Sequence, residues 1–236
     1  MNGESLLVAI EGGDVDGALR ALREHPEDAH ARNGEGISGL MLALYRGQTE
    51  VAEAIRAARN EIDVFEATAL GDAEVVRMLI SEDATRVSEW SPDGFTPLHY
   101  AAFFGHPQVA TVLIEAWADI EALSRNQKFA LDARPLHSAA AARALKVCSV
   151  LLDAGADPNA RQHGEFTPLL EAAQNGDEAL ACLLLSHGAN VNARLADGRS
   201  AAQLAREAGH QSLAQQLQQA YNDRREHCQS QAIPRA

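Results

Sequence analysis

The sequence holds little positive charge and almost no lysine. Its 236 residues include 20 Lys and Arg against 33 Asp and Glu, so the formal net charge is −13. Two of the basic residues, Lys128 and Lys146, are lysines, and the rest are arginines. A chain this acidic repels phosphate groups, which argues against nucleic acid and against anionic membranes as binding partners.

Aromatic residues are also scarce. They make up 5% of the sequence, whereas hydrophobic residues as a whole make up 46%. The high hydrophobic content is sufficient for a continuous core and argues against wholesale disorder. Because Ala and Leu recur throughout, the composition favours thin, closely stacked helices over a globule with a bulky core.

The sequence also has few cysteines and no recognisable targeting segment. Cys148, Cys182 and Cys228 are an odd number without a C-x-x-C pair, which favours a reducing compartment over a disulfide framework. Residues 1–10 lack the basic and apolar segments of a secretory signal. No stretch reaches the roughly 18 apolar residues of a membrane span. We therefore expect a cytoplasmic protein that does not bind membranes.

What the sequence does contain is a repeat. A Gly followed by Asp, Gln or His returns at intervals of 34, 24, 34, 71 and 33 residues. The interval of 71 corresponds to two units, because one unit carries Arg143 where the Gly would fall. The pattern predicts seven units of close to 33 residues. The glycines that define it are Gly13, Gly47, Gly71, Gly105, Gly176 and Gly209.

Each unit is expected to form two short helices. In the clearest one, Thr96 is a suitable N-cap and Pro97 is tolerated at the first helical position. Apolar residues follow at helical spacing over 98–102, Gly105 ends the helix, and a second apolar face lies within 109–114. Two such helices cannot bury their apolar faces alone, so neighbouring units must stack to form the core.

These motifs resemble those of the ankyrin-repeat family. The family pattern T-P-L-H-x-A-A-x-x-G-H matches Thr96–His106 throughout, and Pro135–Ala140 and Thr167–Leu169 repeat it in part. A second family pattern, L-L-x-x-G-A-D-x-N-A, matches Leu151–Ala160 and Leu184–Ala193, the latter with one Asn for Asp. The resemblance covers roughly residues 4–220.

The resemblance implies an all-α fold, an ankyrin-repeat solenoid of about seven helix-turn-helix units with short projecting β-hairpin loops. We expect one ankyrin-repeat domain over residues 1–220, with degenerate terminal units. The repeat pattern is lost over residues 221–236, where we expect a flexible C-terminal tail.

Two units depart from the regular length. One is ten residues short, and its hairpin looks deleted near residues 60–63, which would leave a gap in the row of projecting hairpins. The simplest explanation is a neutral loss in a degenerate unit. Another has about five extra residues between 123 and 134, with Phe129 among them. Long loops are often functional, but insertions in surface loops are also well tolerated.

Trp117 is a third departure, because Gly155 and Gly188 occupy the equivalent positions of later units. If the turn were kept, Trp117 would adopt a left-handed conformation at a cost on the order of 1 kcal/mol. Either the turn is remodelled or the ring has a use. We favour a remodelled turn.

The sequence contains no pattern typical of a catalytic or metal site. His99 and His137 belong to the T-P-L-H motif, in which the family uses the ring for hydrogen bonds between a helix and the neighbouring loop. Cys148 and Cys182 lie among Val and Leu and are interpreted as small core residues. No nucleophile, phosphate or dinucleotide motif occurs. We expect no cofactor, no metal and no enzymatic activity.

In ankyrin proteins the hairpin tips and first helices form a concave binding face. The positions that vary on this face within the family correspond, in the fourth unit, to a group of aromatic residues. Aromatic residues are typical of interface hot spots, because they bury a large area. The alternative is that these rings only cover the neighbouring unit. The residues expected to bind a partner are Trp90, Asp93, Phe95, Phe103, Phe104, Tyr45, Arg46 and Phe166.

Acidic residues lie near the aromatic group in the sequence, at Glu82, Asp83 and Glu89 as well as Asp93. An aromatic patch with an acidic rim suits a protein partner with a basic and partly apolar surface. The sequence thus predicts a non-catalytic protein-interaction module, for example a cytoplasmic scaffold, acting as a monomer. Two alternatives are an acidic inhibitor or immunity-type protein that blocks a basic partner, and a regulatory subunit of an enzyme complex.

Overall fold

The computed structural model describes residues 3–128 and 130–231. Within these ranges the chain forms 14 α-helices and three short 3-10 helices, with no β-strand. The predicted all-α fold is confirmed. The chain divides into two compact units, of which the first ends at Pro97 and the second begins at Leu98. One domain over residues 1–220 stays a prediction, because each unit is compact by itself.

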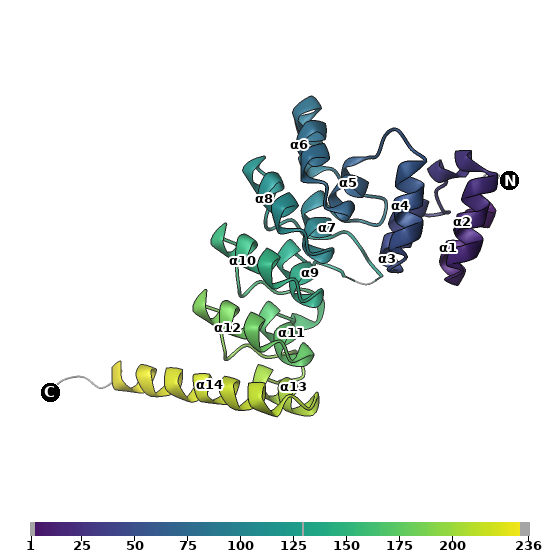
Figure 1. The fold of residues 1–236 in the computed structure, drawn as a ribbon. Coiled ribbons are helices and arrows are strands. Elements are labelled where there is room, and N and C mark those ends of the chain that lie inside the picture. Colours follow the sequence, from purple (N-terminus) through teal and green to yellow (C-terminus); the bar gives the residue numbers. More distant parts are fainter. Residues whose placement is uncertain (1–2, 129, 232–236) are drawn as a thin grey trace. The chain divides into compact units, whose positions relative to one another are not determined.

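The first unit contains three helix pairs (Figure 1). Within it, α1 packs against α3 and α3 against α5, while α2 packs against α4. Each pair therefore stacks on the next in chain order. The elements are α1 (Glu4–Gly12), α2 (Val15–Glu24), η1 (Pro26–His30), α3 (Gly39–Tyr45), α4 (Thr49–Ala57), α5 (Val64–Leu70), α6 (Ala73–Glu82) and η2 (Ala84–Ser88).

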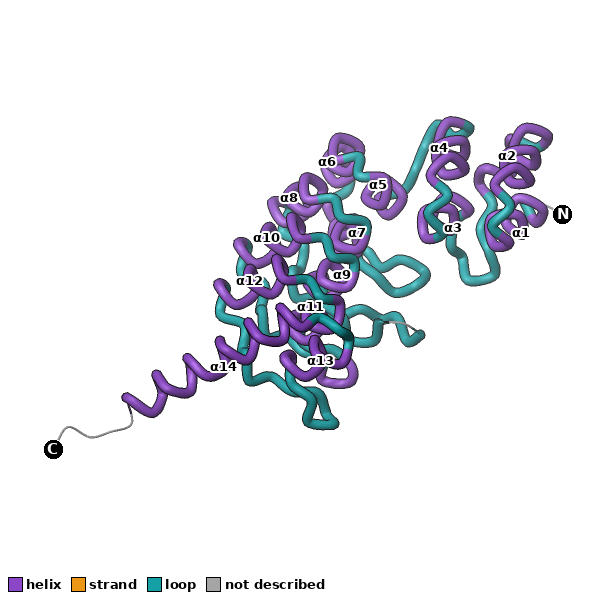
Figure 2. Tube along the Cα trace, turned by 60° about the horizontal axis from the view of Figure 1, so that its bottom comes forward, coloured by secondary structure: helices purple, strands orange, loops and turns teal. Residues whose placement is uncertain are grey.

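Four further helix pairs follow, and α7 starts at the boundary between the units. In the second unit α9, α11 and α13 pack in succession, as do α8, α10 and α12. Figure 2 shows these pairs one after another, with loops projecting beyond them. The elements are α7 (Pro97–Phe103), α8 (Pro107–Glu115), α9 (Pro135–Ala141), α10 (Leu145–Asp153), η3 (His163–Glu165), α11 (Pro168–Asn175), α12 (Glu178–Ser186), α13 (Ala201–Glu207) and α14 (Gln211–Gln231).

Capping side chains and glycines mark the ends of several helices, as the sequence predicts. The Thr167 side chain caps α11 by accepting a hydrogen bond from Leu170 N, and Asp72 caps α6 by accepting one from Val75 N. Gly71 ends α5 with a φ of 79°, which a residue without Cβ adopts at little cost. Most helices bury an apolar face, as at Ala101, which is fully inaccessible to solvent, whereas α6 buries Val76 alone.

Two histidines connect successive helix pairs of the second unit. His99 Nε2 lies 3.0 Å from Ala133 O, and His137 Nε2 lies 3.1 Å from Ala160 O. Because a carbonyl oxygen only accepts, each Nε2 carries the proton, and His137 Nδ1 accepts from Arg134 N over 3.2 Å. Burial lowers the pKa of both rings to about 4, so they are neutral. Their predicted role in linking a helix to the neighbouring loop is confirmed.

Four loops are closed as hairpins by a backbone hydrogen bond across the turn. The bonded N and O atoms belong to Asn33 and Ile37, Ser91 and Phe95, Gln162 and Phe166, and Leu195 and Arg199, at 2.9 to 3.0 Å. No such loop precedes α5, because residues 58–63 alone connect it to α4. The predicted loss of a hairpin near residues 60–63 is confirmed.

A buried ion pair lies where that hairpin is missing. Arg59 Nη1 is 2.6 Å from Glu66 Oε1, and Glu66 is fully buried. Asp63 caps α5 and exchanges hydrogen bonds with Glu66, so both carboxylates have partners. Burial raises the pKa of Glu66, but hydrogen bonds from Arg59 and Ser38 outweigh it and hold the pKa below its usual value.

The long loop precedes α9. Ser124 N donates to Ala133 O over 2.8 Å, so the two ends of the insertion are joined. His163 N donates to Leu131 O over 3.4 Å, which connects the insertion to the next loop. Phe129 lies outside the described residues. A function for residues 123–134 stays a prediction.

Trp117 keeps the left-handed turn. Its φ is 67°, and its N donates to Ile114 O over 3.0 Å at the end of α8. The expectation of a remodelled turn is therefore wrong. The ring is 92% exposed, so the left-handed conformation is held by the turn and the stacked helices and not by burial of the indole.

The C-terminal segment continues the last helix. Residues 221–236 were expected to form a flexible tail, yet α14 runs without interruption from Gln211 to Gln231. Helix formation therefore does not end with the repeat pattern at residue 220. Residues 232–236 lie outside the described residues, and the flexibility of the tail stays a prediction.

Replacing Trp117 with Gly should leave the free energy of unfolding unchanged or raise it by up to about 1 kcal/mol, because Gly has no Cβ to strain a left-handed residue. Urea denaturation followed by circular dichroism measures the change. Trp117→Ala is the matched control, since it removes the ring but keeps the Cβ. A clear loss of stability in the Gly variant would show that the indole packs in solution.

Acid should destabilise the protein through the two buried histidines. Unfolded His takes up a proton near pH 6.5, whereas the folded rings stay neutral to about pH 4. Stability should therefore fall as the pH drops from 6.5 to 4.5, by up to about 2.5 kcal/mol per ring. Urea midpoints at pH 7 and pH 4.5 test this. The control variant His99→Gln/His137→Gln retains a donor but does not titrate, so an unchanged pH dependence would contradict the assignment.

Candidate protein-binding surface

In the first unit a hairpin is bound to the end of α3. Tyr45 is the last residue of α3, and its hydroxyl donates a hydrogen bond to Asp93 Oδ2 over 2.6 Å. Ser91 Oγ donates to Asp93 Oδ1, also over 2.6 Å, and accepts a hydrogen bond from Phe95 N over 3.0 Å. The Asp93 carboxylate therefore fixes the hairpin tip against a first helix.

Five of the predicted residues belong to this first unit, and we call them the first-unit cluster: Tyr45, Arg46, Trp90, Asp93 and Phe95. Tyr45 is 36% exposed and Arg46 is exposed. The remaining three residues are half-buried. The cluster thus presents polar groups and the edges of aromatic rings from one hairpin and one helix end.

In the second unit the predicted Phe103 and Phe104 form a phenylalanine pair at the end of α7. Their ring centroids are 5.1 Å apart at an interplanar angle of 88°, an edge-to-face contact. Phe104 also stacks on Tyr100 at 6.3 Å and 22°. Phe103 is 47% exposed, Phe104 is half-buried and Tyr100 is 3% exposed. The rings therefore form a column that leads from the core to the surface.

Tyr100 was missed in the sequence analysis. A spacing of four residues places Tyr100 and Phe104 on the same helical face, which is the signal that could have identified it. Phe166, the eighth predicted residue, is half-buried and closes its own hairpin by accepting a hydrogen bond from Gln162 N over 3.0 Å.

The structure brings some of the predicted residues together. Tyr45 contacts Asp93 in the first unit, and Phe103 contacts Phe104 in the second. Because the first-unit cluster precedes the boundary at Pro97 and the phenylalanine pair follows it, a single continuous patch of all eight residues stays a prediction.

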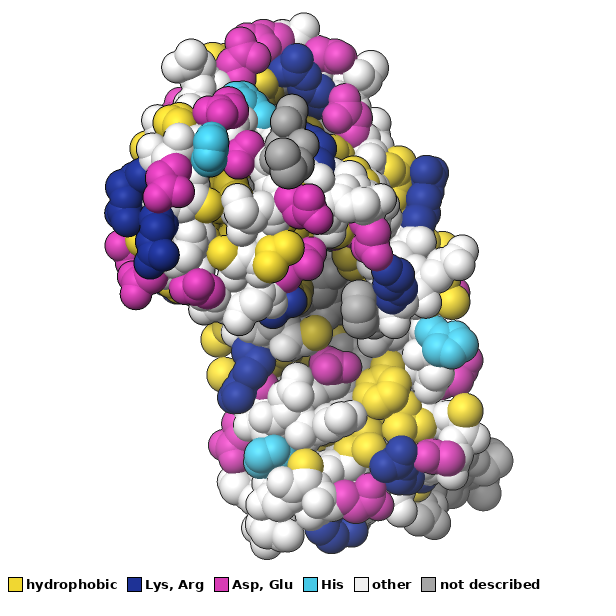
Figure 3. Space-filling view, turned by 90° about the vertical axis from the view of Figure 1, so that its right-hand side faces the viewer, with side chains coloured by type: hydrophobic (Ala, Val, Ile, Leu, Met, Phe, Trp, Pro, Cys, Tyr) yellow, Lys and Arg dark blue, Asp and Glu magenta, His cyan; other side chains and the backbone are white. Residues whose placement is uncertain are grey.

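The predicted acidic rim is held by local hydrogen bonds. Asp83 accepts from Thr85, and this contact lowers its pKa. Glu82 lies 3.1 Å from Arg86 Nη1 in an exposed ion pair. Figure 3 shows acidic side chains spread over one face of the molecule, with basic ones in small separate groups.

The two cysteines whose side chains the structure describes differ in solvent exposure. Cys148 is fully buried, and burial raises the pKa of its thiol to about 12, so it is not a nucleophile at neutral pH. Cys182 is exposed, and its interpretation as a core residue is wrong. It lies on α12, whose buried face consists of Leu180, Ala181 and Leu184, and the helical turn places Cys182 on the other side.

Two further properties concern the described part of the chain as a whole. It contains no cluster of three or more His, Cys, Asp or Glu side chains arranged to hold a metal ion. None of its helices is both long enough and apolar enough to span a bilayer.

Comparison with known proteins gives one consistent family. The family model for ankyrin repeats (three copies) matches residues 64–162 and 136–226. An ankyrin repeat protein of fowlpox virus is 30% identical over 165 residues, which cover 66% of this chain and 36% of the viral protein. The neurogenic locus Notch protein of Drosophila melanogaster is 32% identical over 166 residues, or 70% of this chain and 6% of Notch. The chain thus spans well under two thirds of both relatives.

The ring column predicts different effects for its two outer members. Phe104→Ala should lower the free energy of unfolding by about 1–2 kcal/mol, because a half-buried ring stacked on a buried one is lost. Phe103→Ala should cost under about 1 kcal/mol, since nearly half of that ring is already in water. Urea denaturation of the two variants measures both values. Equal losses, or a larger loss at Phe103, would contradict this order of burial.

Proposed function

The chain belongs to the ankyrin-repeat family, and we propose that it acts as a non-catalytic module that binds another protein through hairpin tips and first helices. Ankyrin repeats are generally protein–protein interaction modules. The whole-protein roles of the fowlpox and Notch relatives are not transferred, because the chain covers 36% and 6% of their lengths. The observation that carries the proposal is the exposed Phe103, supported from below by Phe104 and Tyr100.

This support matters for affinity. An exposed ring that is already held by its neighbours loses little conformational entropy when a partner covers it. Aromatic residues fixed in this way are typical of interface hot spots, where a few side chains contribute most of the binding free energy. Phe103 therefore has the properties of an anchor, and the partner would provide a pocket for the exposed part of its ring.

The first-unit cluster supports the same mode of binding. Asp93 receives hydrogen bonds from Tyr45 and Ser91, which fix the hairpin before any partner arrives. A preformed hairpin lowers the ordering cost of association. Tyr45 and Arg46 add exposed polar contacts at the end of α3, so the surface combines fixed backbone with aromatic and charged side chains.

The net charge of the chain indicates which kind of partner surface would be attracted. With a net charge of −13, the surface favours a protein with a basic and partly apolar face, and disfavours nucleic acid and anionic membranes. We propose a monomeric cytoplasmic scaffold as the simplest form of this activity. The same charge also favours the alternative of an inhibitor that blocks one basic protein.

Affinity capture on the immobilised protein, followed by mass spectrometry, identifies the partner, and calorimetry gives its Kd. Phe103→Ala/Phe104→Ala should weaken binding by at least about 30-fold, or 2 kcal/mol. Met78→Ala is the matched control, because Met78 is also a large exposed apolar side chain, 51% exposed, but lies on a second helix. Its Kd should stay within twofold of the unchanged protein.

Circular dichroism must show that each variant is folded at the temperature of the binding measurement. Binding retained by the folded double variant would contradict the proposal, and so would an equal loss in Met78→Ala. Salt dependence separates the two forms of the activity. An inhibitor of a basic protein should bind one partner and lose affinity steeply between 50 and 300 mM salt, whereas a scaffold should capture several partners with a weaker dependence.

A further inference from the structure

The last helix pair carries polar residues where inner pairs bury small ones. Six residues after the N-cap of each first helix, the second unit has Ala102, Ala140 and Ala173, all fully buried. The same position of α13, six residues after its N-cap Ser200, is the exposed Arg206. An arginine there prevents another pair from stacking in the same way, which is what a terminal unit requires.

Gln203 shows the same change. It occupies the position of His99 and His137, which bond to the following loop. Gln203 Oε1 accepts a hydrogen bond from Ser200 N over 2.9 Å, just as His137 Nδ1 accepts one from its own N-cap residue. Gln203 differs in that, within the described residues, its side chain makes no hydrogen bond to a following loop.

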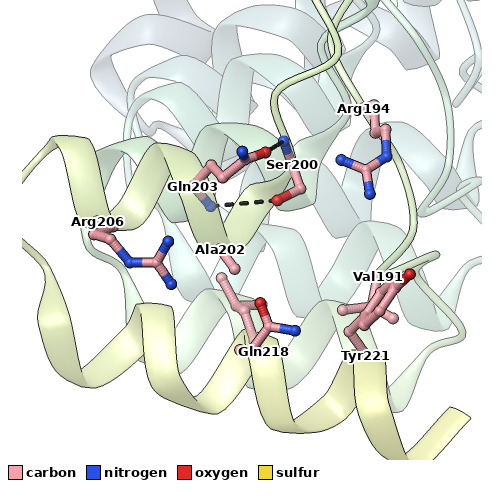
Figure 4. A pocket seen from close by; sticks show the side chains of 9 residues that line it. Val191, Arg194, Ser200, Ala202, Gln203, Arg206, Gln218 and Tyr221 are labelled. Atoms are coloured by element: carbon pink, nitrogen blue, oxygen red, sulfur yellow. Dashed lines mark hydrogen bonds between the residues drawn. The ribbon is translucent and has the colours of Figure 1, made fainter. Parts of the chain in front are cut away.

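A pocket of about 250 Å³ lies on this face, between α13, α14 and the loop that precedes α13. Its floor is apolar, because Val191, Ala202 and Leu217 are buried among its lining residues. Tyr221 lies at one side, and Arg194 and Arg206 approach from opposite sides in Figure 4. The pocket thus combines an apolar base with two guanidinium groups.

The charge at this pocket is positive in an otherwise acidic protein. The two charged side chains among its described lining residues are both arginines. Arg194 is oriented by a hydrogen bond from Nη1 to Gly198 O over 3.0 Å, which leaves its other donors available. Arg206 has no ion pair within the described residues. The neighbouring Arg199 is different, since Asp197 and Glu207 already pair with it.

We infer that this pocket binds an acidic peptide segment, with a carboxylate between Arg194 and Arg206 and an adjacent aliphatic side chain on the apolar floor. A guanidinium presents parallel N–H donors that match the two oxygens of a carboxylate. The volume corresponds to one or two side chains, close to the lower limit of ligand pockets. None of the lining residues belongs to the first-unit cluster or the phenylalanine pair.

A peptide fits better than a polyanion. The net charge of −13 opposes any ligand that carries many phosphates. A single carboxylate experiences far less of this repulsion, and at physiological ionic strength charges beyond about 8 Å are largely screened.

Fluorescence anisotropy tests the assignment with a labelled six-residue peptide that carries one Glu next to Leu, and with the same peptide carrying Gln in place of Glu. The Glu peptide should bind saturably and at least tenfold more tightly than the Gln peptide. Arg206→Ala should weaken it at least tenfold, and Arg194→Gln should do the same. Arg206→Ala introduces the residue that inner pairs carry and should fold normally, which circular dichroism checks.

Arg23→Gln is the control, since it removes the same charge from an exposed position of α2 and should change the Kd by less than twofold. Phe103→Ala/Phe104→Ala should also retain peptide binding, which separates this pocket from the proposed partner surface. Absence of saturable binding up to 1 mM peptide would overturn the inference, as would equal binding by Arg206→Ala. Tighter binding of a short oligothymidylate than of the Glu peptide would also overturn it.

Discussion

Every other feature of this structure depends on the stacking of helix pairs. Apart from α14, the helices are 7 to 10 residues long, and helices shorter than about 12 residues are marginal in water. Within each unit they persist because successive pairs bury their apolar faces against one another. Alanines such as Ala101, Ala139 and Ala172 are fully buried at these contacts, where larger side chains would hold the backbones apart.

Stacking also explains how the chain tolerates the loss of a hairpin. The loops before α9 and α11 provide carbonyl groups that accept hydrogen bonds from the preceding pair, at Ala133 and Ala160. Before α5 the loop is too short, and the buried pair of Arg59 and Glu66 lies in its place. The carboxylate stays ionised although it is fully buried, because Arg59, Ser38 and Asp63 supply hydrogen bonds. Removing either charge alone would leave the other buried without compensation. The loss in the free energy of unfolding would be larger than the loss on breaking an exposed ion pair.

The sequence predicts this fold well because the same local signals recur in unit after unit. N-caps such as Thr167, the glycines after the helices and the linking histidines each act over a few residues, so spacing is enough to place them. Trp117 shows where this fails: the strain of a left-handed Trp is on the order of 1 kcal/mol, and cooperative stacking can hold a turn against so small a penalty. The assignment of Cys182 to the core and the omission of Tyr100 have a different cause. The rotation of a helix about its axis decides which side chain is buried, and spacing alone does not give that rotation.

The candidate surfaces follow from what stacking leaves uncovered. Within each unit successive pairs cover one another's faces, so the first helices offer a partner mainly their ends and hairpins, which is where Phe103 and Tyr45 lie. The last pair has one uncovered face, and an apolar face there would attract another copy of the chain. Arg206 and Gln203 make that face polar, yet the apolar floor beneath them remains. The polar residues Arg206 and Gln203 thus leave a positive pocket on an acidic protein, distinct in charge from the aromatic helix ends at Phe103 and Tyr45.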